Sequence, residues 1–172
     1  MMKESLTKAY STQANAEWYS AYLYLAMSTH ADSIGLKGFA NWLYCQYKEE
    51  MAHGDHMYEY IGERGEKATF SAIAMPEKTE WASLTELFED ALHHEQKVTR
   101  LINDIATLSV KENDHASYNF INWYVDEQVE EESAAEEIVS TLKFVKEDPI
   151  AVYNMDKELQ ARVFVNPFAN AK

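Results

Sequence analysis

The stretch YKEEMAH, residues 47–53, decides how the rest of the chain is interpreted. As part of a helix, it places Glu50 and His53 one turn apart on the same face, where both side chains can reach one metal ion. The pair alone is weak evidence, because a chain this rich in Glu, with 6 His, is expected to contain Glu-x-x-His about once by chance. A second copy occurs at Glu112 and His115, in what reads as a solvated turn. The weight of residues 47–53 therefore depends on what the other helices place beside them.

The composition predicts a single all-α domain over residues 1–172. Gly (5) and Pro (3) are scarce, and helix-forming residues are common. The formal net charge of −14 argues against nucleic acid and an anionic membrane as partners. The single cysteine, Cys45, forms no internal disulfide, and no apolar run approaches the ~18 residues of a membrane span. Because the N-terminus also lacks the apolar core of a signal peptide, we expect a cytoplasmic protein.

Glycines, prolines and capping residues divide the chain into four long helices and a short fifth. Ser5 is a plausible N-cap for the first helix, and Ser83 with Glu86 forms a capping box that opens the third. The expected helical ranges are 5–33, 36–63, 84–110, 115–145 and 150–163, with the bundle over about 5–145 and a tail over 164–172.

The connection between the second and third helices, residues 65–81, fixes the topology. It lacks helical periodicity and contains Pro76. A chain of this length reaches ~55 Å, the full length of a bundle, whereas a hairpin between neighbours needs only about 2–8 residues. We therefore expect a four-helix bundle with one long crossover, in which the second and third helices run parallel.

Each long helix carries a carboxylate near the middle of its most apolar stripe. The acids are Glu17, Glu50, Glu95 and Glu131, and they are expected to meet at one level of the bundle. The four stripes are Tyr10, Gln13, Glu17, Ala21, Tyr24 and Met27; Phe39, Leu43, Gln46, Glu50, His53, Met57 and Ile61; Leu84, Phe88, Ala91, Glu95, Val98, Ile102 and Ile105; and Phe120/Ile121, Tyr124, Gln128, Glu131, Ala135, Ile138 and Leu142.

Converging carboxylates need neutralisation, because burying them costs several kcal/mol each and they repel one another. No inward Lys or Arg is evident at that level. Metal ions can supply the missing charge, and oxygen-rich ligands with one imidazole suit iron or manganese better than zinc or copper. Since one carboxylate can bridge two ions, the set is sufficient for two metals.

Four segments of the sequence, taken together, resemble a known family. They are Asn15-Ala16-Glu17 with Tyr24, EEMAH at 49–53, HEQ at 94–96, and NWYVDEQVEEE at 122–132. With them the chain resembles a bacterial non-haem ferritin, of the ferritin-like di-iron family, over essentially its full length. The resemblance implies a ferritin-like four-helix bundle with the short fifth helix at its C-terminal end.

The resemblance also implies a set of metal ligands. Glu17, Glu50 and His53 would hold the first iron of a ferroxidase centre, and Glu50 would bridge to a second iron. Glu95 and Glu131 would hold that second iron, with Gln128 beside it. A third iron would lie on Glu49, Glu127, Glu130 and Glu131.

The implied function is iron storage with ferroxidase activity. Fe(II) would be oxidised by dioxygen or hydrogen peroxide, and the ferric product stored as oxide mineral in a hollow homo-oligomeric shell of 24 subunits. A further burial surface is also expected from the residues, because the first helix is apolar nearly all round between Trp18 and Met27.

Two aromatic residues, Tyr24 and Trp123, are expected near the metal ligands. Tyr24 lies seven residues after Glu17 on the same face, where it either orients a ligand carboxylate or packs as a core tyrosine. Trp123 resembles a family tryptophan that supplies an electron during dioxygen reduction, or is a packed aromatic. Haem is not expected: haem-binding relatives carry a second Glu-x-x-His on the fourth helix, where this chain has Ser133 and Ala134.

Two alternatives stay open at this point. One is a di-iron peroxidase or oxidase of the rubrerythrin type, without mineral storage. The other is a helical interaction module whose inward acids are protonated or hydrated. Surface or supporting positions are expected for His56, His93 and His94, and a packed thiol for Cys45.

Overall fold

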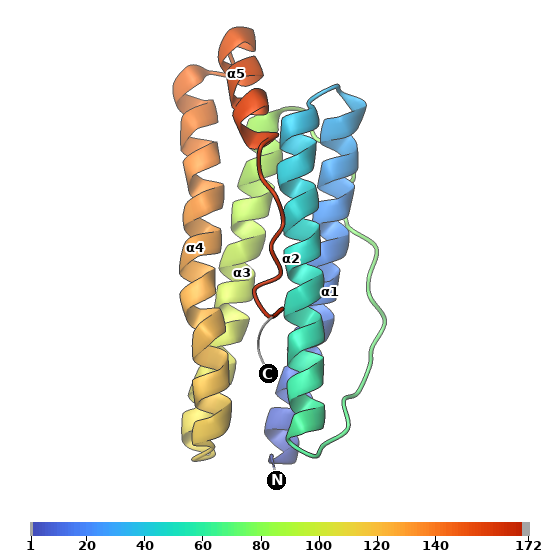
Figure 1. Ribbon diagram of the computed structural model, residues 1–172, viewed down its shortest axis with the longest axis vertical. Coiled ribbons are helices and arrows are strands. Elements are labelled where there is room, and N and C mark those ends of the chain that lie inside the picture. Colours follow the sequence, from blue (N-terminus) through green and yellow to red (C-terminus); the bar gives the residue numbers. More distant parts are fainter. Residues whose placement is uncertain (1, 170–172) are drawn as a thin grey trace.

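The computed structural model describes residues 2–169, and within that range it is all-helical. The helices are α1 (Glu4–Ser33), α2 (Lys37–Glu63), α3 (Leu84–Lys111), α4 (His115–Val145) and α5 (Pro149–Leu159). The four long helices lie side by side in a bundle, with α5 at one end (Figure 1). None of the helices in residues 2–169 is both long and apolar enough to span a membrane.

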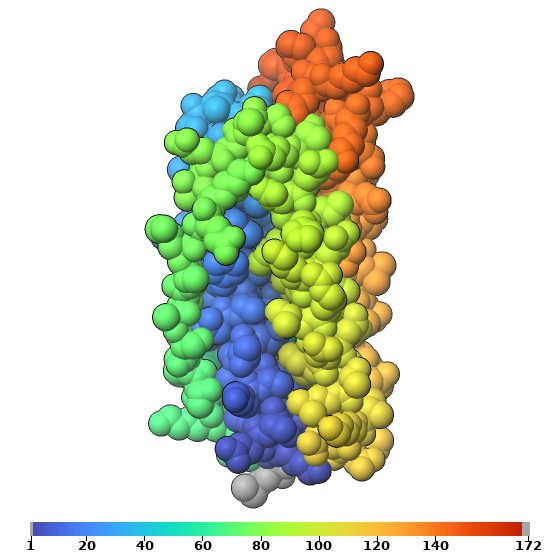
Figure 2. Space-filling model, turned by 180° about the vertical axis from the view of Figure 1, so that it is seen from behind, coloured from blue at the N-terminus to red at the C-terminus, as the bar shows by residue number. Residues whose placement is uncertain are grey.

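The long connection between α2 and α3 is a crossover, as predicted. It leaves the C-terminal end of α2 and travels along the outside of the bundle to the opposite end, where α3 begins (Figure 1). Seen from behind, its residues lie alongside α1, which they partly cover (Figure 2). Helices α2 and α3 are therefore parallel, whereas α1–α2 and α3–α4 form two antiparallel hairpins.

The core consists of two apolar clusters. One contains Met27, Phe39, Leu43, Phe88 and Leu142, toward the end of the bundle where α5 lies. The other surrounds Tyr10 near the opposite end, with Leu6, Met57, Ile61, Ile102 and Ile121. Every residue of the four predicted stripes is buried except Phe120, which is half-buried. Except for Gln13, the buried polar members of those stripes lie in the sequence between members of one cluster and members of the other.

The predicted helix starts are correct for α3 and wrong for α1. Ser83 caps α3, because its hydroxyl accepts a hydrogen bond from the Glu86 N–H at 3.1 Å. The Glu86 carboxylate reaches back to the Ala82 N–H at 2.7 Å. Helix α1, however, begins at Glu4 without a side-chain cap. Ser5 instead donates to Glu112 at 3.1 Å, which ties the start of α1 to the α3–α4 turn.

Helix α5 is shorter than the predicted range 150–163 and ends at Leu159. Asn41 of α2 explains the early end: its side-chain amide donates to the carbonyls of Leu159 and Arg162 at 3.3 and 2.9 Å. The chain then runs back along α2 to residue 169 (Figure 1). The predicted tail 164–172 thus follows α2 as far as it is described, and its last three residues lie outside the described range.

Asp156 of α5 attaches that helix to the N-terminus of α2. Its carboxylate accepts hydrogen bonds from the N–H groups of Gly38 and Phe39 at 2.7 and 3.1 Å. These groups lack intrahelical partners, and the helix dipole favours an anion there. The approach requires glycine, because a Cβ on Gly38 would lie 1.6 Å from the Asp156 carbonyl oxygen.

Gly38→Ala is expected to dislodge α5 and to lower the thermal unfolding midpoint. The obstacle is backbone, which cannot rotate away, and losing the two charged hydrogen bonds costs about 2 kcal/mol or more. Gly62→Ala in the same helix is the matched control, since its Cβ would meet nothing within 4 Å. That control should be neutral or stabilising by up to about 1 kcal/mol. Equal melting curves for the two variants would contradict the close α2–α5 packing.

Candidate metal centre

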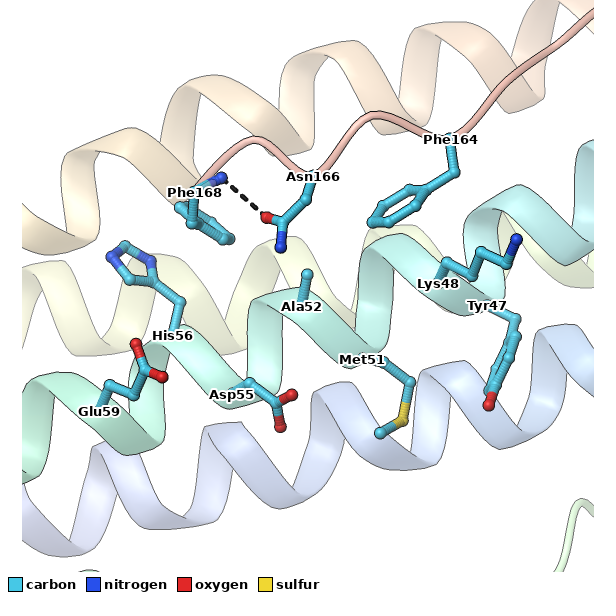
Figure 3. A pocket seen from close by; sticks show the side chains of 10 residues that line it. All are labelled: Tyr47, Lys48, Met51, Ala52, Asp55, His56, Glu59, Phe164, Asn166 and Phe168. Atoms are coloured by element: carbon cyan, nitrogen blue, oxygen red, sulfur yellow. Dashed lines mark hydrogen bonds between the residues drawn. The ribbon is translucent and has the colours of Figure 1, made fainter. Parts of the chain in front are cut away.

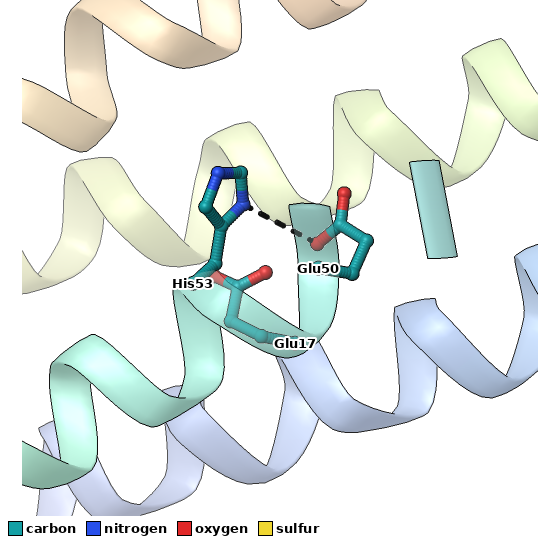
Figure 4. A group of neighbouring side chains, drawn as sticks. All are labelled: Glu17, Glu50 and His53. Atoms are coloured by element: carbon teal, nitrogen blue, oxygen red, sulfur yellow. Dashed lines mark ion pairs between the residues drawn. The ribbon is translucent and has the colours of Figure 1, made fainter. Parts of the chain in front are cut away.

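Glu17, Glu50 and His53 form one compact group between α1 and α2. Each offers a ligand atom, and these atoms all lie within 4.8 Å of one another. Each of the three side chains is 2% exposed. In Figure 4 the carboxylate of Glu17 and the pair from α2 point toward one another across the two helices. The i, i+3 spacing of Glu50 and His53 places both on the face of α2 that meets α1.

The His53 ring is suited to bind a metal. Burial is the main cause that lowers its pKa to about 3, with a smaller contribution from His56, so the ring is neutral. Its Nδ1 lies 3.6 Å from a Glu50 oxygen, which is longer than a hydrogen bond. Its Nε2 is buried and has no hydrogen-bond partner within residues 2–169. A neutral imidazole with unused nitrogen atoms is the form that ligates metals.

Glu95 and Glu131 bring the carboxylates of α3 and α4 into the same region. Glu95 is 1% exposed and Glu131 6%. The Tyr24 hydroxyl donates to one Glu95 oxygen at 2.5 Å, and the Gln128 amide donates to the other at 3.1 Å. Tyr24 therefore orients the α3 carboxylate.

Two glutamines that were placed on the inward stripes without a role also hold site carboxylates. Gln13 donates to Glu17 at 2.8 Å, and Gln46 donates to Glu131 at 2.6 Å. Their spacing on the stripes was visible in the sequence. The partner of Gln13 lies four residues on in the same helix, whereas the partner of Gln46 was not visible, because Gln46 bonds across the bundle to α4.

The four carboxylates share one electrostatic environment. Burial is the largest cause that raises the pKa of Glu17 to about 7 and the pKa of Glu50 well above its usual range. The charges of Glu95, Glu17 and Glu131 raise the pKa of Glu50 further. The pKa values of Glu95 and Glu131 are also raised, mainly by burial. Within residues 2–169, no Lys or Arg forms an ion pair with any of these four acids. Such a set fits cations.

Neighbouring residues fix the position of His53. A Cβ on Gly54 would lie 2.5 Å from the Trp18 indole nitrogen, so glycine permits α1 and α2 to approach closely here. The Tyr124 hydroxyl donates to the His53 carbonyl at 3.1 Å. Trp123 meets the His53 ring edge-on, with 5.5 Å between ring centroids. Trp123, for which an electron-donating or a packing role was expected, therefore lies against the ring of His53.

The acids predicted to hold a third ion lie at the border of this layer. Glu49 and Glu127 are partly buried, and Glu130 is exposed. The Glu49 carboxylate pairs with Arg162 at 2.6 Å. No inward Lys or Arg was predicted at the level of the four buried acids, and within residues 2–169 none pairs with them, but Arg162 pairs with Glu49 beside them. Arg162 was missed because residues 150–163 were predicted as one helix, whereas the extended segment after Leu159 carries Arg162 back along α2.

The remaining histidines lie outside the compact group. His56 lies 3.0 Å from the Tyr124 hydroxyl, and His94 lies 2.7 Å from the Ser20 hydroxyl. His93 and His115 are exposed. Glu112, the partner of His115 in the second Glu-x-x-His, is paired with Lys3 at 2.5 Å. Cys45 is a buried thiol. These positions agree with the surface, supporting and packing roles expected for them.

The chain is similar to proteins of one known family. The family model of the ferritin-like domain matches residues 7–145. Bacterial non-heme ferritins of Staphylococcus haemolyticus (strain JCSC1435) and Staphylococcus saprophyticus subsp. saprophyticus are 42% and 43% identical over 164 residues, covering 95% of this chain and 98% of each relative. A solved open pore ferritin from the hyperthermophilic archaeon Archaeoglobus fulgidus matches with a TM-score of 0.92 at 44% identity, covering 95% of this chain and 100% of that one.

Glu17→Gln is expected to stabilise the metal-free protein at pH 8 by up to about 3 kcal/mol, from the pKa difference between 4.5 and about 7. Because the folded-state pKa is raised, the wild-type carboxyl costs nothing below pH 4.5. The cost grows as the pH rises toward 7 and is constant above it. The side-chain amide oxygen of the variant can still accept the hydrogen bond that Gln13 donates to Glu17 in the wild type.

Urea unfolding of the metal-free proteins at pH 4.5 and pH 8 measures this effect. Glu136→Gln, an exposed acid on α4, is the control and should change stability at neither pH. A Glu17→Gln gain that is equal at both pH values would show that the buried charge is not its cause.

Proposed function

The chain belongs to the ferritin family, whose members oxidise Fe(II) and store the ferric product, and from this premise we propose that its mid-bundle acids form a di-iron ferroxidase centre. Iron storage is the function of the chain, and the rubrerythrin-type alternative is not favoured, since the relatives at about 40% identity are non-heme ferritins. The observation that carries the proposal is the buried group of Glu17, Glu50 and His53, whose ligand atoms lie within 4.8 Å of one another.

The proposed ligands fall into two halves. Glu17 and His53 bind one Fe(II), Glu95 and Glu131 bind the other, and Glu50 bridges them. Support comes from the burial of all five side chains and from the electrostatic coupling of Glu50 to the other three acids. Two bound Fe(II) supply positive charge that the layer lacks. Each gives one electron to dioxygen, or to hydrogen peroxide, and becomes Fe(III).

The residues around the ligands hold them in place. Tyr24 and Gln128 each donate to one oxygen of Glu95, and Gln46 donates to Glu131. Such partners fix the orientation of ligand carboxylates before the metal arrives. Gln128 is also proposed as a direct neighbour of the second iron, besides its hydrogen bond to Glu95. No haem is proposed.

A third iron is proposed on Glu49, Glu127, Glu130 and Glu131. The charges of Glu130 and Glu49 contribute, after burial, to the raised pKa of Glu127. The charge of Glu49 likewise contributes to the raised pKa of Glu131. These acids therefore lie close enough to influence one another, and they border the di-iron layer through the shared Glu131.

Storage needs a container, and a homo-oligomeric shell of 24 subunits is proposed. An apolar groove on the outer face of α1 and α2 supports an intersubunit contact there. The groove is lined by Trp18, Tyr22, Leu25, Tyr47, Met51, Asp55 and Ile73, of which Tyr22 is 46% exposed and Ile73 45%.

His53→Ala is expected to slow aerobic Fe(II) oxidation by at least about tenfold, because a metal ligand is lost. The change is followed by the ferric absorbance after Fe(II) is added to the metal-free protein. His115→Ala is the matched control, since it disrupts the other Glu-x-x-His, at the bundle end, and should oxidise iron at the wild-type rate.

Two results would count against the proposed function. Equal rates for His53→Ala and wild type would show that iron is oxidised elsewhere. Wild-type protein that oxidises iron but retains only two or three irons per subunit would instead point to the oxidase without storage.

The shell predicts a particle of several hundred kilodaltons at neutral pH, in place of a 19.8 kDa monomer. Tyr22→Lys is expected to shift the protein toward smaller species, because it buries a charge in the proposed contact. Light scattering coupled to size-exclusion chromatography measures both. A stable wild-type monomer would exclude the shell.

A further inference from the structure

The side chain of Arg162 forms an ion pair with Glu49, one of the acids of the proposed third iron site. An Arg162 guanidinium nitrogen donates to the Glu49 carboxylate at 2.6 Å, and the two side chains are only 27% and 17% exposed. Within residues 2–169, this is the one ion pair in which a Lys or Arg contacts any of the proposed iron ligands. Glu49 is thus already neutralised by the protein itself.

The guanidinium is held in place from a second side by α2. Its other terminal nitrogen donates to the Trp42 carbonyl at 3.4 Å, and its central carbon lies 4.6 Å from the centre of a Trp42 ring. Such stacking favours a fixed guanidinium over a freely moving one. Arg162 therefore approaches Glu49 in a defined orientation.

The backbone of the segment after α5 is anchored independently of the Arg162 side chain. Asn41 donates to two of its carbonyls, those of Gln160 and of Arg162 at 3.4 and 2.9 Å, and to the carbonyl of Leu159 at the end of α5. Farther along, Phe164, Asn166 and Phe168 lie over α2 (Figure 3). The Phe168 ring stacks on His56, with 3.7 Å between ring centroids. A change of the arginine side chain alone leaves these contacts in place.

A metal ion and this guanidinium compete for the same ligand. Glu49 neighbours Glu131 and Glu127 electrostatically, and the charge of Arg162 also acts on Glu131. A cation bound among these acids gains most if Glu49 is free, and it is repelled by a guanidinium in contact with Glu49. The two ions of the proposed centre need neither Glu49 nor its displacement from Arg162.

We infer that Arg162 is a tethered competitor for the third metal: its guanidinium occupies Glu49, so that a divalent cation binds there only after displacing it. The inference rests on the proposed function. Arg162 thereby sets the relative affinities of the sites, because its guanidinium weakens the third site and leaves the two sites of the di-iron centre strong. A weakly bound third ion is released readily. Such release suits a protein in which the ferric product must leave the site and join the mineral.

The competition is tested by titrating the metal-free protein with Co(II) under anaerobic conditions. Calorimetry and the visible absorbance of the bound ion measure the binding. Wild type is expected to bind two ions per subunit tightly and a third weakly. Arg162→Gln should tighten the third site by about 10- to 100-fold, the range typical of groups that surround a metal site. Arg162→Lys, which keeps the charge without the forked geometry, should give a smaller change.

Two further variants control the experiment. Arg64→Gln removes another partly buried arginine in an ion pair, with Asp114 at 2.8 Å, at the end of the bundle where α2 ends and α4 begins, and should leave all Co(II) affinities unchanged. Glu49→Gln combined with Arg162→Gln should lose the gained site and keep the two strong ones. Far-UV circular dichroism and particle size confirm that each variant is folded.

The outcomes separate the inference from the function on which it rests. Two strong sites with a third of equal affinity in wild type and Arg162→Gln would overturn the role of Arg162 and leave the di-iron centre standing. Absence of strong Co(II) binding in wild type would overturn the proposed centre itself.

Discussion

The fold is built around a layer of four buried carboxyl groups, to which no Lys or Arg of residues 2–169 is paired. Glu17, Glu50, Glu95 and Glu131 come from four different helices, and each is at most 6% exposed. Removing such groups from water is costly, and their mutual repulsion adds to the cost. Apolar clusters and glutamine and tyrosine donors hold the layer together until cations arrive. The stability that the rest of the bundle provides is thus partly used to keep a site ready for metal.

Helical periodicity explains why so much of this layer was predictable. A buried face recurs every three or four residues, so an acid such as Glu95 among Phe88, Val98 and Ile102 must point inward. The crossover followed from the length of residues 65–81 and from Pro76, because distance limits what a chain can connect. The resemblance to ferritins then assigned roles to side chains that periodicity could only place.

The errors lie where periodicity carries no information. The end of α5 depends on Asn41, a residue 118 positions away in the sequence from the carbonyl of Leu159 that it binds. The approach of Arg162 to Glu49 depends on that early end, and the start of α1 depends on contacts with Glu112. Each is a hydrogen bond or ion pair between distant segments, so no local pattern announces it. The cross-bundle partner of Gln46 was hidden for the same reason.

The two-hairpin topology divides the proposed site between two parts of the chain. Glu17, Glu50 and His53 all belong to α1 and α2, which are joined by only three residues between Ser33 and Lys37. One half of the proposed site therefore comes from helices that are neighbours in the sequence. Glu95 and Glu131 belong to the second hairpin, which the crossover between Glu63 and Leu84 joins to the first. That crossover is thus the one covalent link between the two halves of the site, and the layer of buried acids is complete only where the two hairpins pack against each other.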